Sequence, residues 1–294
     1  MALESISDPA SSYQQAMTRA RAFMARDDDI VAPPARTALL SHGERRPVAV
    51  VLLHGYTNNP AQYAQFAPLL HERGANVFVP RMPLHGDRDR LTKSLATLTA
   101  EMLLASATEA LDIAYGLGSD VAVMGISMGG CLAAYFAQFR DIALAVPVAP
   151  DFSLLQLPYP VSRLAAKVLR VLPNFFLWWD PRVRNRQLPA TAYPRFSTRA
   201  LAQTLRIGDD VYAAARREDP LAGRIVTMVN RADPAVNNDV AKSVSQEWAK
   251  RRGGAGVEYV ELRNLPANHD IIDPENPLAR TDLVYPKLLE ALGV

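Results

Sequence analysis

The sequence predicts an α/β fold built around a mostly parallel sheet. Short apolar runs alternate with helical patterns along most of the chain, and several of these runs end in a turn of glycine and polar residues. Such an alternation demands right-handed crossovers between parallel strands. With 294 residues, of which 49% are hydrophobic and 21% charged, the chain is long enough for one large domain with an insertion.

The expected elements follow one another in chain order. A surface helix at 11–26 and a short extended piece at 36–40 precede the first buried strand. Apolar runs predict strands at 47–53, 75–80, 121–124, 142–146, 223–229 and 256–262. Helical spacing predicts helices at 61–73, at 91–115 with a break at Gly116-Leu-Gly118, from the turn at 127 to 139, and at 282–292.

The alternation lapses between residues 151 and 218. Prolines, helical patches and the aromatic run 175–179 replace it, so we expect a mainly helical cap inserted over the strand ends. The expected organisation is an N-terminal helix and lead-in at 1–46, a core formed by 47–150 and 219–294, and the cap at 151–218.

One helical patch of the expected cap, at 161–172, is amphipathic. A place for this helix at a membrane surface is one hypothesis that the pattern raises. Its apolar face carries Leu164, Val168, Val171 and Leu172, and the opposite face carries Arg163, Lys167 and Arg170.

Charge and cysteine content exclude several classes of protein. The net charge is only +2, so a broad nucleic-acid-binding face is not expected. The single cysteine, Cys131, excludes an internal disulfide and a cysteine-rich metal cluster, and its position after the serine turn predicts a buried, inert thiol. We expect no cofactor and no metal.

The N-terminal residues lack the basic and continuous apolar regions of an export signal. No later apolar run approaches the length that spans a membrane. We therefore expect a soluble, cytoplasmic protein without an integral membrane segment. The sequence leaves open whether two copies form a homodimer.

The stretch that carries chemistry is Gly125-Ile-Ser127-Met-Gly129, which stands between an apolar strand and an amphipathic helix. In the pattern G-x-S-x-G the turn is so tight that side chains two residues before and after the serine hardly fit. Ser127 Oγ would then stand above the strand ends at a helix N-terminus, where free N–H groups favour developing negative charge. The alternative is a glycine-rich turn that only lets the helix pack closely on the sheet.

A second turn, His54-Gly55-Tyr56, follows the strand at 47–53. A backbone N–H at this place can complete an oxyanion hole, and we expect the N–H groups of Tyr56 and Met128 to be its two donors. Without the serine motif, an ordinary strand-to-helix turn would be the better interpretation.

A serine hydroxyl needs a base within hydrogen-bond reach, and that base needs an orienting carboxylate. Asp233 and His269 each follow a late strand, so both are expected at the edge of the sheet where Ser127 stands. We take Ser127, Asp233 and His269 as the catalytic residues.

Other residues compete for these two roles. Asp239 is expected within the next helix, and Asp270 adjoins His269 in sequence, which makes convergence of the two side chains awkward. The histidines at 42 and 71 precede the site, and His54 is expected to support its own loop.

The order Ser127, Asp233, His269, each just beyond a strand, resembles the α/β-hydrolase superfamily. More narrowly, His-Gly-Tyr-Thr at 54–57, Gly-Ile-Ser-Met-Gly-Gly at 125–130 and the late Asp and Asn-His are similar to its capped carboxylesterase and monoacylglycerol-lipase branch, also grouped with serine aminopeptidase-type hydrolases. The resemblance implies an α/β-hydrolase fold, with a doubly wound, mostly parallel sheet and an inserted, mainly helical cap. The chain departs from the branch at Met82-Pro-Leu-His-Gly86, where Arg-Gly-His-Gly is frequent.

The resemblance also implies roles for the residues singled out above. Ser127 would be the nucleophile, His269 the base, Asp233 its orienter, and the N–H groups of Tyr56 and Met128 the oxyanion hole. Cap aromatics that only pack the cap on the core, and a structural hydrogen bond at His85, are the alternatives to substrate contact. The residues expected to contact a small-molecule ester with an apolar acyl group are His54, Gly55, His85, Phe175, Trp178 and Trp179.

The resulting hypothesis is a cofactor-independent serine hydrolase that cleaves carboxylic esters. A thioesterase, an amide or peptide hydrolase, and a hydrolase of carbon–carbon bonds are alternatives within the same fold. A non-catalytic receptor that uses the same pocket is an alternative of another class, and the complete triad argues against it.

Overall fold

The computed structural model of the chain describes residues 3–154 and 157–294. Its centre is a seven-stranded sheet with the strand order β1-β3-β2-β4-β5-β8-β9, in which β1 alone pairs antiparallel. The prediction of a mostly parallel α/β sheet is therefore confirmed. The strands are β1 (Ala38–Leu40), β2 (Arg46–Leu53), β3 (Asn76–Val79), β4 (Gly118–Ile126), β5 (Leu144–Val148), β8 (Arg224–Asn230) and β9 (Val257–Leu262).

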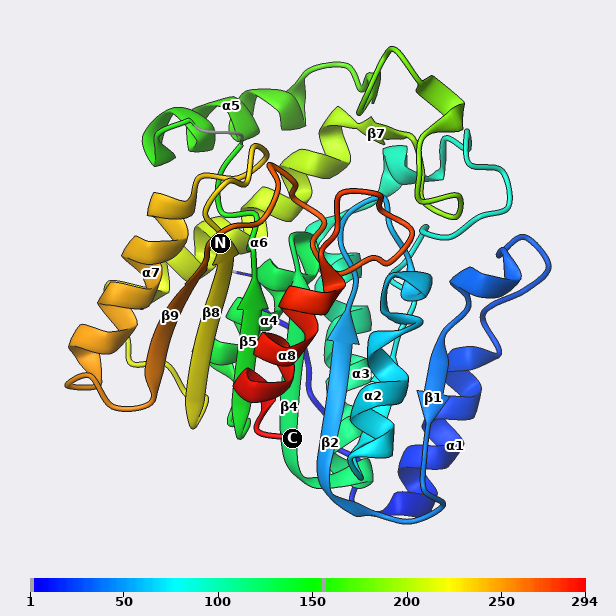
Figure 1. Cartoon of the computed structure of the whole chain (residues 1–294), viewed down its shortest axis with the longest axis vertical. Coiled ribbons are helices and arrows are strands. Elements are labelled where there is room, and N and C mark those ends of the chain that lie inside the picture. Colours follow the sequence, from blue (N-terminus) through cyan, green and yellow to red (C-terminus); the bar gives the residue numbers. More distant parts are fainter. Residues whose placement is uncertain (1–2, 155–156) are drawn as a thin grey trace.

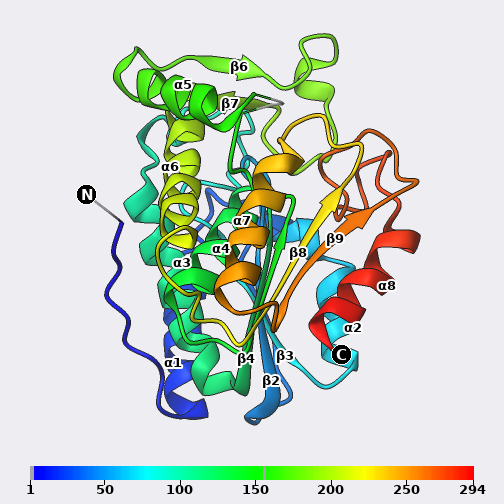
Figure 2. The same ribbon diagram turned by 90° about the vertical axis from the view of Figure 1, so that its left-hand side faces the viewer.

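Helices cover both faces of this sheet, as Figures 1 and 2 show. Each face buries its own cluster of apolar side chains, because strands that are covered on both sides need two apolar surfaces. One face is covered by α3 (Ala100–Leu117), α4 (Met128–Phe139), α6 (Thr198–Ala215) and α7 (Asn238–Arg251), with α1 (Tyr13–Met24) outside α3, and the other by α2 (Phe66–Glu72) and α8 (Thr281–Leu292).

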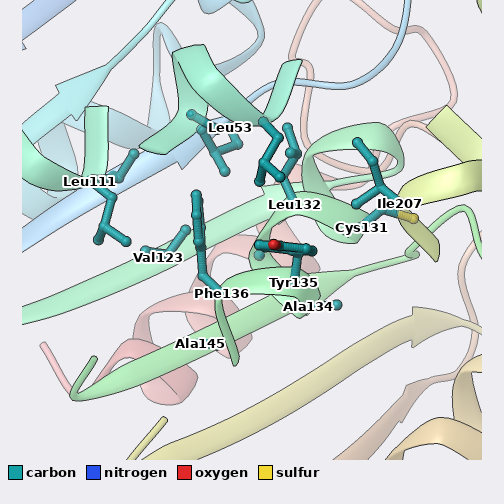
Figure 3. Packing of buried hydrophobic residues seen from close by; sticks show 14 of the residues in the cluster. Leu53, Leu111, Val123, Cys131, Leu132, Ala134, Tyr135, Phe136, Ala145 and Ile207 are labelled. Carbon is teal, nitrogen blue, oxygen red and sulfur yellow. The ribbon is translucent and has the colours of Figure 1, made fainter. Parts of the chain in front are cut away.

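Helix α4 lies between the sheet and α6, and its side chains fill the main core (Figure 3). Leu132 and Phe136 are fully buried in the cluster that also contains Val123 of β4. Cys131 points toward Ile207 of α6, and its burial raises the pKa of the thiol well above the ordinary value. The cysteine is thus the buried, protonated thiol that its position predicted.

Between β5 and α6 the chain forms α5 (Tyr159–Val171) and a small antiparallel ribbon of β6 (Phe176–Trp178) and β7 (Arg195–Ser197). Figures 1 and 2 place these elements beyond one end of the main sheet. Helix α6 falls within the segment expected to form the cap, yet it packs along α4, and its inner side chains belong to the main core. The elements that stand over the end of the sheet are therefore α5, β6 and β7, and we call residues 157–197 the cap.

The helix predicted at 91–115 begins later than expected. Residues Ser94–Thr97 form a 3₁₀ turn, and α3 starts only after Thr99, whose hydroxyl accepts a hydrogen bond from Met102 N–H at 3.2 Å. At its other end the helix continues through Gly116. A Cβ there would lie 2.7 Å from Ala16 Cβ, so the glycine permits close packing of α1 rather than ending the helix.

Parallel strands bring their carboxyl ends to one edge of the sheet. The turns that follow β2, β4, β5, β8 and β9 therefore meet at the edge over which the cap lies. Within the described residues, none of the helices combines the length and the apolar character needed to cross a membrane.

Candidate active site

Ser127 stands at the sharp turn between β4 and α4. Its backbone has φ 58° and ψ −116°, a conformation that is strained for any residue other than glycine. The turn is fixed by the Ser127 N–H, which donates to Val148 O at 3.0 Å, and by Ser127 O, which accepts from the amides of Cys131 and Asp151 at 2.9 and 3.3 Å. Ser127 is half-buried at this edge of the sheet.

The glycines of the G-x-S-x-G pattern are required by packing. A Cβ on Gly125 would lie 2.2 Å from Gly129 O, and one on Gly129 would lie 2.0 Å from Leu53 O. Both distances are far below van der Waals contact with backbone atoms that cannot move aside. The N-terminus of α4 is therefore pressed against the end of β2, which places Ser127 beside the loop that follows β2.

His269 and Asp233 are brought together by the loops that follow β9 and β8. His269 Nδ1 lies 2.7 Å from Asp233 Oδ2, and the Asp233 side chain is fully buried while that of His269 is 25% exposed. The second carboxylate oxygen accepts hydrogen bonds from the amides of Ala235 and Val236 at 2.8 and 3.4 Å. A carboxylate only accepts, so the proton lies on Nδ1 and Nε2 keeps its lone pair for a proton acceptor role.

The charges around His269 favour its protonated form. Burial lowers the pKa of the imidazole, but the charge and hydrogen bond of Asp233, together with the charges of Asp151 and Asp270, outweigh burial and raise that pKa above its ordinary value. The ring is thus a stronger base than a free histidine.

Asn230, the last residue of β8, joins the acid loop to the histidine loop. Its Nδ2 donates to Pro266 O at 2.9 Å and to Asn268 O at 2.7 Å, while its Oδ1 accepts from Ala232 N–H at 3.0 Å. Because the side chain is fully buried, these three bonds fix the two loops relative to each other. The sequence analysis missed this residue.

A second asparagine, Asn58, joins the histidine loop to the loop after β2. Its Nδ2 donates to Asp270 Oδ2 at 3.0 Å and to Asp273 Oδ2 at 3.1 Å. The alternative acid Asp270 is thus occupied by this link, and Asp239 is exposed on α7. The geometry favours Asp233 over both as the partner of His269.

The two amides expected to form an oxyanion hole lie on either side of Ser127. Gly55 is so close that a Cβ there would lie 3.5 Å from Ser127 Cβ, and Tyr56 is its neighbour in the loop. Met128 is the first residue of α4, where the helix leaves its N–H groups unpaired. Within the described part of the chain, neither the Tyr56 amide nor the Met128 amide donates a hydrogen bond.

His54 and His85 are fully buried, so their rings support the loops instead of facing the open side of the site. His54 Nδ1 donates to Gly55 O at 2.9 Å, and its Nε2 accepts from Met82 N–H at 3.0 Å. An amide N–H only donates, so this ring is neutral, and burial lowers its pKa well below the ordinary value. His85 Nδ1 bonds Pro83 O at 2.8 Å, and burial lowers the pKa of His85 to about 4.

The cap residues expected to contact substrate lie at the outer side of the site. Phe175 is 56% and Trp179 is 43% exposed, whereas Trp178 is half-buried. The indole N–H of Trp179 donates to Thr57 Oγ1 at 2.9 Å, so the cap is tied to the loop that carries Tyr56. A second hydrogen bond joins the cap to this loop, because the Tyr56 hydroxyl donates to Ser197 O at 2.9 Å.

The structure brings His269 and Asp233 into direct contact, but the hydroxyl of Ser127 makes no hydrogen bond within residues 3–154 and 157–294. Hydrogen bonds between nucleophile and base are often long in substrate-free sites and tighten when the substrate binds. The structure thus holds His269 oriented by Asp233, without a hydrogen bond between His269 and the half-buried Ser127 within the described residues.

Asp151 is a buried acid of this site that the sequence analysis did not single out. It follows β5 in the chain, its amide donates to Ser127 O, and its Oδ2 accepts from Thr204 Oγ1 of α6 at 3.2 Å. Burial raises the pKa of Asp151 to about 6, although the nearby His269 opposes this rise. An acid just beyond a strand end was the signal that identified Asp233, and the same signal could have found Asp151.

Replacing Asp151 by Asn is expected to move the acid limb of the pH profile of kcat/KM to lower pH. In the role of base that the sequence predicts for it, His269 would accept a proton only as a neutral ring, and activity would then rise as the pH passes through the pKa of His269. The charge of Asp151 raises that pKa, and its removal lowers it. Initial rates measured across pH test this, with Asp209→Asn as the control, because burial also raises the pKa of Asp209 but this acid does not act on His269. An unmoved acid limb in Asp151→Asn would contradict the expectation.

Comparison with known proteins places this chain in a family. Residues 50–281 match the Alpha/beta hydrolase family. A thermostable monoacylglycerol lipase of Bacillus sp. (strain H-257) is 26% identical over 167 residues, which span 56% of this chain and 64% of that relative, just under two thirds of its length.

Solved structures agree in fold. A structure reported for the metagenome-derived lipolytic enzymes LipS and LipT superposes with a TM-score of 0.68 at 20% identity, covering 88% of this chain and 98% of the other. The monoacylglycerol lipase of Paleococcus ferrophilus gives a TM-score of 0.65 at 20% identity, covering 87% and 97%.

The chain belongs to the alpha/beta hydrolase family, because the match to that family covers well over half of its residues. The α/β-hydrolase fold expected from the sequence is thereby confirmed.

Proposed function

We propose that this protein is a serine hydrolase that cleaves carboxylic esters, of the carboxylesterase or monoacylglycerol-lipase kind. The observation that carries the proposal is the His269–Asp233 pair, joined at 2.7 Å, at the same sheet edge as a serine held in a strained turn. The family of the chain and the lipolytic function of the proteins it resembles support the choice of reaction.

In the proposed reaction, Ser127 Oγ attacks the ester carbonyl carbon while His269 Nε2 takes the hydroxyl proton. The negative charge that develops on the carbonyl oxygen is stabilised by the N–H groups of Tyr56 and Met128. The imidazolium then gives its proton to the departing alcohol, and an acyl group remains on Ser127. Water, deprotonated by His269, releases the acid and restores the serine.

The surroundings of each group fit this sequence of steps. Asp233 holds the Nδ1–H tautomer and stabilises the imidazolium, since its buried carboxylate lies 2.7 Å from Nδ1 of the ring. The N-terminus of α4 directs its unpaired amides and the positive end of its dipole at the position where the oxyanion forms.

The substrate that we propose is a small ester with an apolar acyl group. Trp179 packs its ring at 4.2 Å from that of Phe196 and lies beside the loop of Tyr56, so the cap offers apolar area close to the oxyanion donors. The similarity of the chain to two monoacylglycerol lipases supports the same class of substrate.

A panel of acyl substrates tests this proposal. We expect turnover of p-nitrophenyl esters and of monoacylglycerols, with slower or absent turnover of matched thioesters and anilides. The purified protein is assayed at equal substrate concentration across acyl chain lengths. Hydrolysis of thioesters or amides without hydrolysis of the corresponding esters would contradict the ester assignment and favour the alternatives within the same fold.

A further inference from the structure

The amphipathic pattern of α5 is not explained by packing on the core. Two small residues of this helix, Ser162 and Ala166, are buried. Ala166 packs against Ala202 and Leu205 of α6, and Ser162 Oγ accepts a hydrogen bond from Leu154 N–H at 2.7 Å. Leu169 packs on the cluster around Ala166, but four other large apolar side chains of the helix are exposed, each to 44% or more of its surface. They are Val161, Leu164, Val168 and Val171.

These exposed residues share one side of the helix. They are spaced by three, four and three residues, which is the spacing of a single stripe, and this stripe lies opposite the side that holds Ser162 and Ala166. Arg163, Lys167 and Arg170 lie beyond one edge of this stripe. The helix thus presents an apolar stripe to the outside, with basic residues along one side of it.

The strand β6 adds further apolar side chains to the same cap. Phe175, Leu177 and Trp179 alternate along the chain and are 56%, 49% and 43% exposed, whereas Phe176 and Trp178 between them are half-buried. Of the 17 large hydrophobic residues that are exposed in the described chain, ten lie between residues 161 and 188. Figure 2 shows α5 and β6 at the outer end of the molecule.

Charge is concentrated in this region too. The cap, residues 157–197, carries seven Lys or Arg residues and one acidic residue, Asp180. The whole chain carries 32 basic and 30 acidic residues, so the remainder has 25 basic and 29 acidic residues. The cap therefore carries a net positive charge, whereas the remainder of the chain carries a net negative charge.

We propose that the outer cap face docks on the surface of an anionic phospholipid bilayer. This face is defined by the apolar stripe of α5, the outward residues Phe175, Leu177 and Trp179, and the basic residues between 163 and 186. Apolar side chains enter the acyl boundary of the bilayer while Lys and Arg side chains pair with lipid phosphates. Two copies of the chain joined through this face would bring two positively charged caps together, so charge repulsion disfavours self-association there.

Docking through this face would also place the active site close to the bilayer. Trp179 belongs to the outer cap face and its indole N–H bonds Thr57 in the loop of Tyr56, so the bilayer would lie next to the entrance of the site. This consequence rests on the proposed function, whereas docking itself does not.

The test is flotation or co-sedimentation of the full chain with vesicles, in the Ser127→Ala background so that lipid turnover has no part in the readout. We expect binding to vesicles of phosphatidylcholine and phosphatidylglycerol, weakening as salt is added, and much weaker binding to phosphatidylcholine alone. The combined change Leu164→Ser, Val168→Ser and Val171→Ser should weaken binding by roughly tenfold or more, because it removes inserted apolar area. The change Lys167→Gln, Arg184→Gln and Arg186→Gln should cost about fivefold per residue at low salt.

Leu221→Ser and Leu278→Ser are the matched control, because these side chains are 56% and 51% exposed outside the cap. We expect this control to bind like the parent. No binding of the parent to anionic vesicles, equal binding to both vesicle types, or undiminished binding of the stripe variant would overturn the proposal. Analytical ultracentrifugation tests self-association. A dimer of the parent that is absent in the stripe variant would assign the outer cap face to self-association and would also overturn the proposal.

Discussion

Replacing Ser127 by Ala is expected to reduce kcat/KM for short p-nitrophenyl esters by about 10³- to 10⁶-fold, since the acyl-enzyme can no longer form. The change removes one oxygen atom that makes no hydrogen bond within the described residues, so the fold should remain intact. Circular dichroism and thermal unfolding of the variant check the fold, and initial-rate measurements check the activity.

A second variant at the same position separates chemistry from folding. Ser127→Gly also lacks the hydroxyl, but it removes the Cβ from a backbone with φ 58° and ψ −116°. Relief of this strain should raise the free energy of unfolding by roughly 1 kcal/mol or more relative to Ser127→Ala. Both variants should be equally inactive. Substantial ester turnover in either one would remove Ser127 from the mechanism.

Replacing Asp233 by Asn is expected to lower kcat by about 10²- to 10⁴-fold. The amide that replaces the carboxylate can donate to Nδ1, which drives the proton to Nε2, where it prevents the ring from accepting the proton of Ser127. The charge that raises the pKa of His269 is lost too. Measurement of kcat over a range of pH records both effects.

Asp239→Asn is the control for this experiment. Asp239 competed with Asp233 in the sequence, yet its side chain is exposed at the start of α7. We expect the control to retain activity within about twofold of the parent, as surface substitutions away from a site commonly do. A larger loss in Asp239→Asn than in Asp233→Asn would reverse the assignment of the acid.

The sheet and the serine turn could be predicted because their signals are local. The strands covered on both faces appear as continuous apolar runs, as in β2, and the turn at Ser127 has steric requirements that only glycine meets two residues away. The resemblance to the α/β-hydrolase superfamily also rests on short sequence motifs, such as the turn at Ser127. The pairing of His269 with Asp233 was predicted from their positions after two strands, and the structure shows the contact.

The remaining parts of the site depend on contacts between distant segments. Asn230 and Asn58 join loops that are far apart in the sequence, and nothing around either residue distinguishes it from an asparagine in an ordinary turn. Asp151 becomes part of the site only because α6 buries it beside His269.

The orientation of α5 could not be predicted from the sequence either. Its two faces could be read from spacing, but an apolar stripe usually faces a core. Only the packing of α5 on α6, with Ser162 and Ala166 buried, shows that the stripe faces solvent. The delayed start of α3 could not be predicted either. Residues 91–99 have helical composition, but Ser94–Thr97 form a 3₁₀ turn, and the distant Arg195 donates a hydrogen bond to Leu91 O.

Covalent labelling by a fluorophosphonate, followed by peptide mass spectrometry, tests whether Ser127 is the activated nucleophile. We expect the folded protein to gain one phosphonyl group on the peptide that contains Ser127, the unfolded protein to gain none, and Asp233→Asn to react far more slowly. A folded protein that stays unlabelled, or that carries the label on another residue, would contradict this role of Ser127.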